Sequence, residues 1–473
     1  MQNSSIMQRT ADPSADPLRE AQRIAIRLIV VLGGLIGSVG IAAAHGGGLA
    51  GAQPERLAVP TWLFLTTGGS VIGVSFLLAS FVTDRELIAY AHSEWQTLRT
   101  PEGVLRRAGQ LLGVVGLGAV LVTGFVGSTE ALRNPAILIV WAGWWAGYTM
   151  TIYLLGNSWP ALNPFRTLTQ PLGDGVVEYP SRLNRWPSVV GLLAIIWIEV
   201  VSPLADDPRL LATMISGYLG VTVIGAVLFG SETWFEHVDP VSNVFRQYGK
   251  VAPIQRTENG LSLVTPGTRL STDPADDWSE VGLIIALVWG TTYDGFVSTP
   301  LWSDLAPSIV ALGVPPVVLY PLVLALGFCL FGGAYWGAIR YARRLAPTHL
   351  APEAIARLFA PSLLAIAAGY HLAHYLSYFL TVSPALFATI LNPLGGGTPA
   401  ALVLPSWFPG LAIAFVLLGH LLAIWVAHSV AYERFPSKLQ AIRSQYSLTL
   451  VMIAYTMVSL WIVTQPFAAP PYL

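Results

Sequence analysis

Cysteine is almost absent from this sequence: Cys329 is the single one among 473 residues, and it lies inside an apolar segment. A lone cysteine forms no intrachain disulfide and no CxxC pair, and it cannot supply the thiolates of an iron–sulfur cluster or a zinc–thiolate site. Any metal that this chain binds must therefore be held by histidine, carboxylate or backbone groups.

Charged residues are also scarce. They make up 11% of the sequence, whereas 54% of it is hydrophobic and the mean hydropathy is +0.60. Soluble domains carry about 25% charged residues, so this composition predicts an integral membrane protein with an all-α fold, a polytopic bundle of transmembrane helices. The net charge of −1 gives no basic surface for nucleic acid. The sequence also lacks a P-loop and a G-x-S-x-G stretch, so it carries no signal of ATP use or of a serine hydrolase.

The N-terminal region has two parts. Residues 1–23 are polar and are expected to be flexible. In residues 24–44 an apolar run follows basic residues and ends in three alanines. The second part fits a first transmembrane helix, and it also fits a signal peptide that is cleaved after Ala44. Cleavage would make His45 the N-terminal residue, whose amine and imidazole together can chelate a metal ion.

Ten further segments are long and apolar enough to cross a bilayer, which gives about eleven spans in total. They lie near residues 61–83, 108–128, 135–156, 188–205, 210–230, 281–302, 314–340, 360–383, 408–430 and 447–466. With a cytoplasmic N-terminus before any processing, 22 of the 25 lysines and arginines fall inside, and only Arg56, Arg133 and Arg209 fall outside. This asymmetry predicts a plasma-membrane protein with an external C-terminus. Residues 45–473 then form one multi-span domain with cytoplasmic loops at 84–107, 157–187 and 231–280.

The cytoplasmic loops carry three patterns. Trp159 to Arg166 and Trp234 to Arg246 each run from Trp through Asn-Pro or Asp-Pro to Phe-Arg, directly after a span. An internal repeat of two helical hairpins produces such a recurrence, and so does chance, because tryptophan and proline are common at these positions. Gly260 to Leu270 predicts a small hairpin around its Pro-Gly turn. The loop 84–107 mixes apolar and charged residues, as an interfacial helix does.

The most informative stretch is a polar stripe inside a long apolar run. His371, His374, Tyr375 and Tyr378 occupy positions i, i+3, i+4 and i+7, so they share one face of a helix. Such groups are costly in hydrocarbon, and they usually face a protein interior, a cavity or a partner. The stripe is therefore a candidate functional site.

Three more polar groups fall at the depth of these histidines. With a rise of about 1.5 Å per residue, Glu199, Asp294 and His420 lie in the same central slab of the bilayer as His371 and His374. We therefore predict that the three histidines face one interior cavity with Asp294 and Glu199 on its wall. The alternative is that each histidine only forms a hydrogen bond to a neighbouring helix.

The segment around Asp294 has an unusual composition for a span. Gly290 to Phe296 combines two glycines and two threonines with the acid, and these residues lower helix propensity. We expect the helix to be kinked or broken there, as in the discontinuous helices that bind substrate in many transporters. The alternative is a close helix–helix contact through Gly290 and Gly295.

Histidine and carboxylate at one depth suggest a metal or haem. His371, His374, His420 and Asp294 are candidate ligands for copper, zinc, nickel or iron. His374 and His420, on adjacent spans, are also candidate axial ligands of one b-type haem.

Four stretches together resemble a known family. They are Ala44-His-Gly ahead of Pro60-Thr-Trp-Leu-Phe64, Gly156-Asn-Ser-Trp-Pro-Ala-Leu-Asn-Pro-Phe-Arg-Thr-Leu168, Thr292-Tyr-Asp-Gly-Phe-Val-Ser-Thr-Pro-Leu-Trp302, and Ala373-His-Tyr375 with Gly419-His-Leu-Leu-Ala-Ile-Trp-Val-Ala-His428. The chain resembles a poorly characterised prokaryotic membrane family of actinobacteria and haloarchaea, whose members are often labelled fenitrothion hydrolase. The resemblance runs over most of the chain. It implies organophosphate hydrolysis and assigns no role to any residue.

The sequence therefore predicts a protein of the lipid bilayer that acts on a small molecule or an ion, and it does not separate an enzyme from a transporter. The favoured interpretation is a metal- or haem-binding protein of transport or redox type, with its site at the midplane. The alternatives are a secondary transporter without metal and a membrane hydrolase of organophosphate type.

Overall fold

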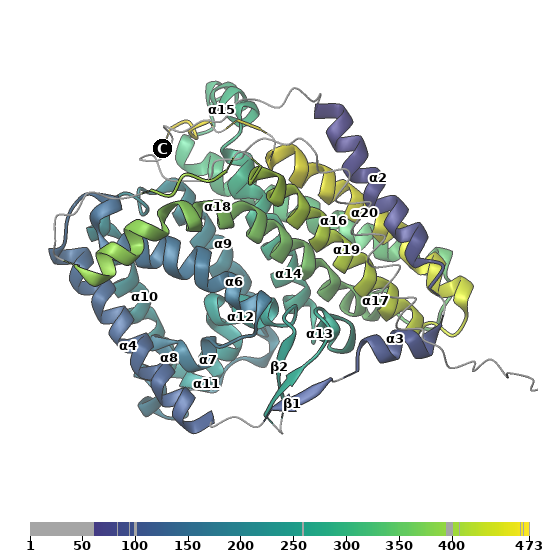
Figure 1. Ribbon diagram of the computed structural model, residues 1–473, viewed down its shortest axis with the longest axis horizontal. Coiled ribbons are helices and arrows are strands. Elements are labelled where there is room, and N and C mark those ends of the chain that lie inside the picture. Colours follow the sequence, from purple (N-terminus) through teal and green to yellow (C-terminus); the bar gives the residue numbers. More distant parts are fainter. Residues whose placement is uncertain are drawn as a thin grey trace, which may run out of the picture. The chain divides into compact units, whose positions relative to one another are not determined.

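The computed structural model describes residues 61–473 except 83, 94, 99–101, 258, 259, 394–400, 406, 464, 467 and 473. The expectations for residues 1–23, 24–44 and His45 lie outside this part of the chain. The described residues form helices and one three-stranded sheet (Figure 1). This architecture agrees with the predicted all-α membrane bundle.

Eight helical spans of the described residues are long and apolar enough to cross a membrane. They lie in α4 (Glu102–Val126); in α5 (Pro135–Ile137), η2 (Leu138–Tyr148) and α6 (Thr149–Leu154) as one run; in α10 (Pro208–Phe229); in α14 (Trp278–Val297); in α16 (Pro316–Leu345); in α17 (Pro352–Phe359), η6 (Ala360–Ser362) and α18 (Leu363–Leu391) as one run; in α19 (Pro409–Arg434); and in α20 (Lys438–Val463). Two of the predicted spans correspond to shorter apolar helices, Thr66–Ala79 within α2 (Thr61–Ala79) and α9 (Trp186–Val201). All ten segments predicted after residue 60 thus coincide with helices.

Short helices connect these spans. They are α3 (Arg85–Ala91), η1 (Ala131–Arg133), α7 (Trp159–Leu162), α8 (Pro164–Thr169), η3 (Gln170–Leu172), η4 (Ser181–Leu183), α11 (Ser231–Thr233), η5 (Trp234–Val238), α12 (Pro240–Gly249), α13 (Thr268–Thr272) and α15 (Pro300–Ala311). The helix α3 lies in the loop where the sequence predicts an interfacial helix.

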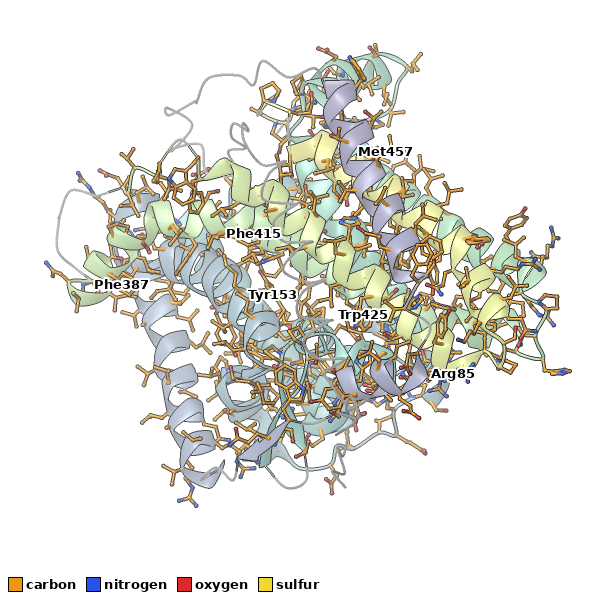
Figure 2. The ribbon with its side chains drawn as sticks, turned by 45° about the vertical axis from the view of Figure 1, so that its right-hand side comes forward. Arg85, Tyr153, Phe387, Phe415, Trp425 and Met457 are labelled. Carbon is orange, nitrogen blue, oxygen red and sulfur yellow. The ribbon has the colours of Figure 1, made fainter. Side chains whose placement is uncertain are left out.

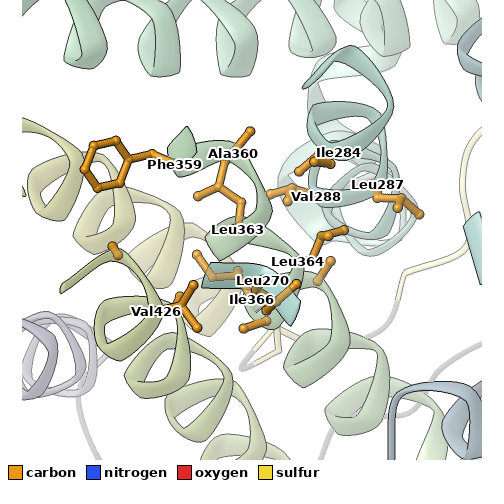
Figure 3. Packing of buried hydrophobic residues seen from close by; sticks show 14 of the residues in the cluster. Leu270, Ile284, Leu287, Val288, Phe359, Ala360, Leu363, Leu364, Ile366 and Val426 are labelled. Carbon is orange, nitrogen blue, oxygen red and sulfur yellow. The ribbon is translucent and has the colours of Figure 1, made fainter. Parts of the chain in front are cut away.

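The helices α14 and α18 are central to the bundle. In the apolar windows of α14 and of the α17–α18 run, 89% of the residues are buried, against 17–56% in the other six spans. Figure 3 shows Ile284 and Val288 of α14 near Leu363 and Leu364 of α18, within the main hydrophobic core. A polar group on the inner faces of these two helices is therefore surrounded by protein rather than lipid.

The helices α18 and α19 cross through two glycines. A Cβ atom on Gly369 would lie 2.7 Å from the carbonyl oxygen of Phe415 and 2.8 Å from Cα of Gly419. Only residues without a side chain allow two helix backbones to approach this closely. The crossing therefore depends on both glycines.

The sheet corrects one expectation. Its strands are β1 (Gln96–Leu98), β2 (Ile254–Thr257) and β3 (Gly260–Leu263), with β3 in the centre and antiparallel to both neighbours. The hairpin is thus β2–β3, and the predicted hairpin around Pro266-Gly267 is wrong. Gly267 has φ of +83°, a left-handed conformation that suits glycine, and it is the residue before α13.

The expectation of a broken helix at Asp294 is also wrong, because α14 continues from Trp278 to Val297. The Thr292 hydroxyl donates a 2.8 Å hydrogen bond to the Val288 carbonyl one turn earlier, which satisfies it inside the helix. The glycines serve close packing: a Cβ on Gly290 would clash with Ile196, and a Cβ on Gly295 would lie 2.6 Å from Oη of Tyr370. This is the helix–helix contact that the sequence offered as the alternative.

Candidate functional site

The site is centred on an acid and a histidine from the two most buried spans. Nε2 of His374 in α18 lies 3.6 Å from Oδ2 of Asp294 in α14, and their side chains are 10% and 8% exposed. The distance allows an ion pair whenever the imidazole is protonated. Because both helices pack together along their length, the pair is held inside the bundle.

Tyrosines surround the carboxyl group. Tyr293, Tyr370 and Tyr375 all lie within electrostatic range of Asp294. The ring of Tyr370 stacks on His374 with 5.8 Å between centroids and 15° between planes. Glu199 of α9 reaches Tyr293 and Tyr375, so a second carboxyl group borders the same cluster.

His371 precedes His374 by three residues in the stripe and is fully buried. Its Nδ1 is 3.0 Å from the hydroxyl of Tyr153 in α6. Its ring meets Trp145 of η2 edge-on at 5.6 Å and lies 4.6 Å from the Tyr375 ring. Tyr153 is among the helices in the middle of the bundle in Figure 2. The span that contains η2 and α6 thus lines the site next to His371.

His420 contacts a backbone carbonyl of its own helix, whereas the other two histidines contact side chains of other helices. It is fully buried in α19, and its Nδ1 is 2.8 Å from the carbonyl oxygen of Val416 on its own helix. The neighbouring Gly419 is the residue that faces α18, and one residue further along a helix turns the side chain by about 100°. The contacts of the site link Asp294, His374 and His371 with α6, α9 and η2. His420 is not tied to them.

The geometry offers no metal-ligand set. Among the described residues, no three His, Cys, Asp or Glu side chains come close enough together to hold a metal ion. The predicted sharing of a metal or haem by His371, His374, His420 and Asp294 therefore has no support in this part of the chain. Organophosphate hydrolysis relies on a metal-bound nucleophile, and the donors for it are not grouped here.

Comparisons with protein-family models, with curated proteins and with solved structures found no match. Inference about function therefore depends on the geometry of the chain itself.

Sequence reasoning missed one residue of α18 itself, Tyr370, and the residues that other helices contribute. Tyr370 precedes His374 by four residues, so helical periodicity was a sufficient signal to include it. Tyr153 gave no signal, because tyrosine is common near the ends of spans. Trp145 lies in the middle of a span that no local pattern links to His371. It belongs to a π-helix of 11 residues, and π-helical geometry frequently occurs at functional sites.

A buried ionic network fixes the beginning of α14. Glu280 accepts from Nζ of Lys250 at 2.9 Å and from Nε2 of Gln247 at 2.6 Å, and it lies 3.6 Å from Nη1 of Arg185. Lys250 and Arg185 also pair with Asp273 and Asp276, at 3.1 and 3.0 Å. The helix that carries Asp294 is thus anchored by charge at one end and by close packing at the other.

Proposed function

We propose that the protein is a proton-coupled secondary transporter and that Asp294 and His374 form its proton-exchanging pair. The observation that carries the proposal is the 3.6 Å distance between these groups on the inner faces of the two most buried spans. Ionisable residues at this depth are rare, and chains of acids and histidines serve as proton relays in pumps and transporters. An imidazole and a carboxyl group exchange a proton at about 2.6–3.2 Å or through one water molecule, so a small shortening of the 3.6 Å distance brings this pair into range.

The polar neighbours of the pair support a path toward one end of the bundle. His371 is within electrostatic range of His374, and its Nδ1 is 3.0 Å from the Tyr153 hydroxyl. The Tyr153 ring lies 5.5 Å from that of Tyr248 in α12. The helix α12 belongs to the loop 231–280, which we expect on the cytoplasmic side. Imidazole and hydroxyl groups both accept and donate protons, so this series suits proton transfer.

This proposal is the transporter alternative of the sequence analysis, without a metal. It accounts for the burial of the pair between α14 and α18, and it requires neither a third ligand nor a cofactor. The solute that is carried with the proton is expected to be small.

Proton flux into vesicles tests the proposal. The protein is reconstituted in vesicles that contain a pH-sensitive dye, and valinomycin with a potassium gradient imposes an inside-negative potential. We expect wild-type vesicles to acidify, and Asp294→Asn or His374→Gln to slow this by roughly a hundredfold, the low end of the contribution of a positioned proton-transfer group. His420→Gln is the matched control and should retain the flux. Because no solute is supplied, wild-type flux equal to that of protein-free vesicles would exclude a proton path that works without solute, and full flux in Asp294→Asn would overturn the role of the pair.

A further inference from the structure

The polar stripe of α18 continues beyond the pair to Tyr378. Tyr378 follows His374 by four residues and Tyr375 by three, and residues at these spacings are neighbours on one helix face, with Cβ atoms about 5–6 Å apart. Its ring is partly buried between the main core and the smaller cluster around Leu138 and Val382. The hydroxyl group therefore extends the polar face away from His371, toward the other end of the helix.

A carboxyl group from another part of the chain lies in the electrostatic surroundings of this tyrosine. Asp206, in the connection between α9 and α10, lies within electrostatic range of Tyr378. The same residue borders a cavity of about 380 Å³. The cavity is lined by Gly124, Gly127, Ser128, Thr129, Asp206, Asp207, Pro208 and Arg209. Asp206 is exposed, so its carboxylate is accessible to water in this cavity.

The adjacent acid has a different role. The Asp207 carboxylate accepts hydrogen bonds from the backbone N–H groups of Arg209 and Leu210, at 2.9 and 3.0 Å, and so caps α10. Its lone pairs serve the helix terminus. Asp206 has no such role in the cap, and its carboxylate is the acidic group near Tyr378.

We infer that Asp206 is the proton acceptor at one entrance of the path and that Tyr378 relays the proton between Asp206 and the Asp294–His374 pair. The inference rests on the proposed function and adds a second entrance to the proton path. A proton from water binds the Asp206 carboxylate. The Tyr378 oxygen then accepts a proton on a lone pair while its own O–H proton leaves toward His374, so the tyrosine is neutral before and after the step.

The charged side chains at this entrance are mainly acidic. Asp206 and Asp207 line the cavity together with one basic residue, Arg209. The connections that form the cavity join α4 to α5 and α9 to α10. The predicted topology places both connections outside, where few basic residues lie. The entrance is thus expected on the outer surface, opposite the path through Tyr153.

The vesicle assay separates this inference from the proposed function. We expect Asp206→Asn and Tyr378→Phe each to slow acidification by about tenfold, which corresponds to about 1.4 kcal/mol in the barrier. Asp207→Asn is the matched control, since asparagine caps a helix as well as aspartate does. If the wild type conducts protons and Asp294→Asn does not, yet Asp206→Asn and Tyr378→Phe conduct as the wild type does, the entrance is wrong and the pair stands.

Chemical rescue removes the remaining ambiguity of a folding defect. In a Cys329→Ser background, Asp206→Cys is treated with membrane-impermeant methanethiosulfonate reagents. A reagent that carries a carboxylate should restore the flux, and one that carries a quaternary ammonium should not. Equal flux after both reagents would contradict a proton-accepting role for position 206.

Discussion

The amide nitrogen Nδ2 of Asn163 donates a 3.2 Å hydrogen bond to Oγ of Ser242. This contact joins the two turns that share the Trp to Phe-Arg pattern. In each turn the cap residue has almost the same backbone, with φ and ψ of −61° and 108° at Asn163 and of −64° and 113° at Asp239. Each side chain accepts from the backbone N–H three residues later, and proline follows directly. Asn134 before Pro135 and Asp207 before Pro208 cap α5 and α10 in a similar way, so this geometry alone does not distinguish an internal repeat from chance recurrence.

The difference between the two caps predicts a pH effect on stability. Burial raises the pKa of the Asp239 carboxyl group, and hydrogen bonds from Tyr218 and Ser242 and the charge of Arg166 oppose the rise only in part. A carboxyl group whose pKa is raised on folding stabilises the protein below its unfolded pKa of about 3.9, and that contribution is lost as the pH rises through the folded pKa. Asparagine, already present at position 163, cannot ionise.

We therefore expect Asp239→Asn to gain thermal stability relative to the wild type as the pH rises from about 4. The unfolding temperature in detergent, followed by tryptophan fluorescence across this range, measures the difference. Asp207→Asn, at an exposed cap, is the control and should show a smaller dependence. A difference between Asp239→Asn and the wild type that does not change with pH would contradict the prediction.

The glycine crossing of α18 and α19 predicts that glycine-to-alanine substitution lowers stability at Gly369 but raises it at Gly337, which lies outside the crossing. Gly369→Ala places a Cβ against backbone atoms that cannot move aside, so we expect a loss of about 1–3 kcal/mol in the free energy of unfolding. A Cβ on Gly337 of α16 meets nothing within 4 Å. Gly337→Ala should therefore gain roughly 0.5–1 kcal/mol, since alanine favours a helix interior. Equal losses in the two variants, measured by denaturant titration in micelles, would show that the crossing tolerates a methyl group.

The network at Glu280 predicts a large cost for the loss of one acid. Its side chain is 3% exposed and contacts Lys250 and Arg185, so Glu280→Ala leaves two cations less well compensated. Breaking a buried ion pair costs about 3–5 kcal/mol. Glu130→Ala is the control, because Glu130 is 64% exposed in its pair with Arg133 and such pairs contribute about 0–1 kcal/mol. Similar unfolding free energies for the two variants would argue against a stabilising network.

The contact between Tyr153 and His371 predicts an effect on flux as well as an effect on stability. Tyr153→Phe removes the hydroxyl group and should cost about 1–3 kcal/mol of stability at most. On the proposed path it should also slow vesicle acidification by about tenfold. Tyr148→Phe is the matched control, since its hydroxyl contacts Ser158 away from the pair. Unchanged flux in Tyr153→Phe would place the path elsewhere.

Depth along each helix was predictable from the sequence, and direction around the helix was not. Counting residues placed Asp294 and His374 in one slab, and the structure brings them to 3.6 Å. The same count included His420, whose neighbour Gly419 takes the position facing α18. The composition of Gly290 to Phe296 was noticed correctly, but low helix propensity loses to close packing when partner helices surround the segment. The partners Tyr153 and Trp145 come from a distant span, which no local pattern identifies.

The sheet shows the same limit. β3 was recognised as a strand, but its partners could not be chosen from the sequence. Leu263 pairs with Gln96 on one side and with Ile254 on the other, across very different separations along the chain. Such pairing is set by how α3 and α13 bring the two loops together.

The glycine crossing also constrains how the protein can move. With backbone in contact with backbone at Gly369 and Gly419, α18 and α19 form one rigid body, because sliding or tilting would drive main-chain atoms into each other. On the proposed transport function, access to the site from alternate sides then requires displacement of α14 against this body. That displacement pulls Asp294 away from His374, so the helix motion that opens the site also separates the two groups that exchange the proton.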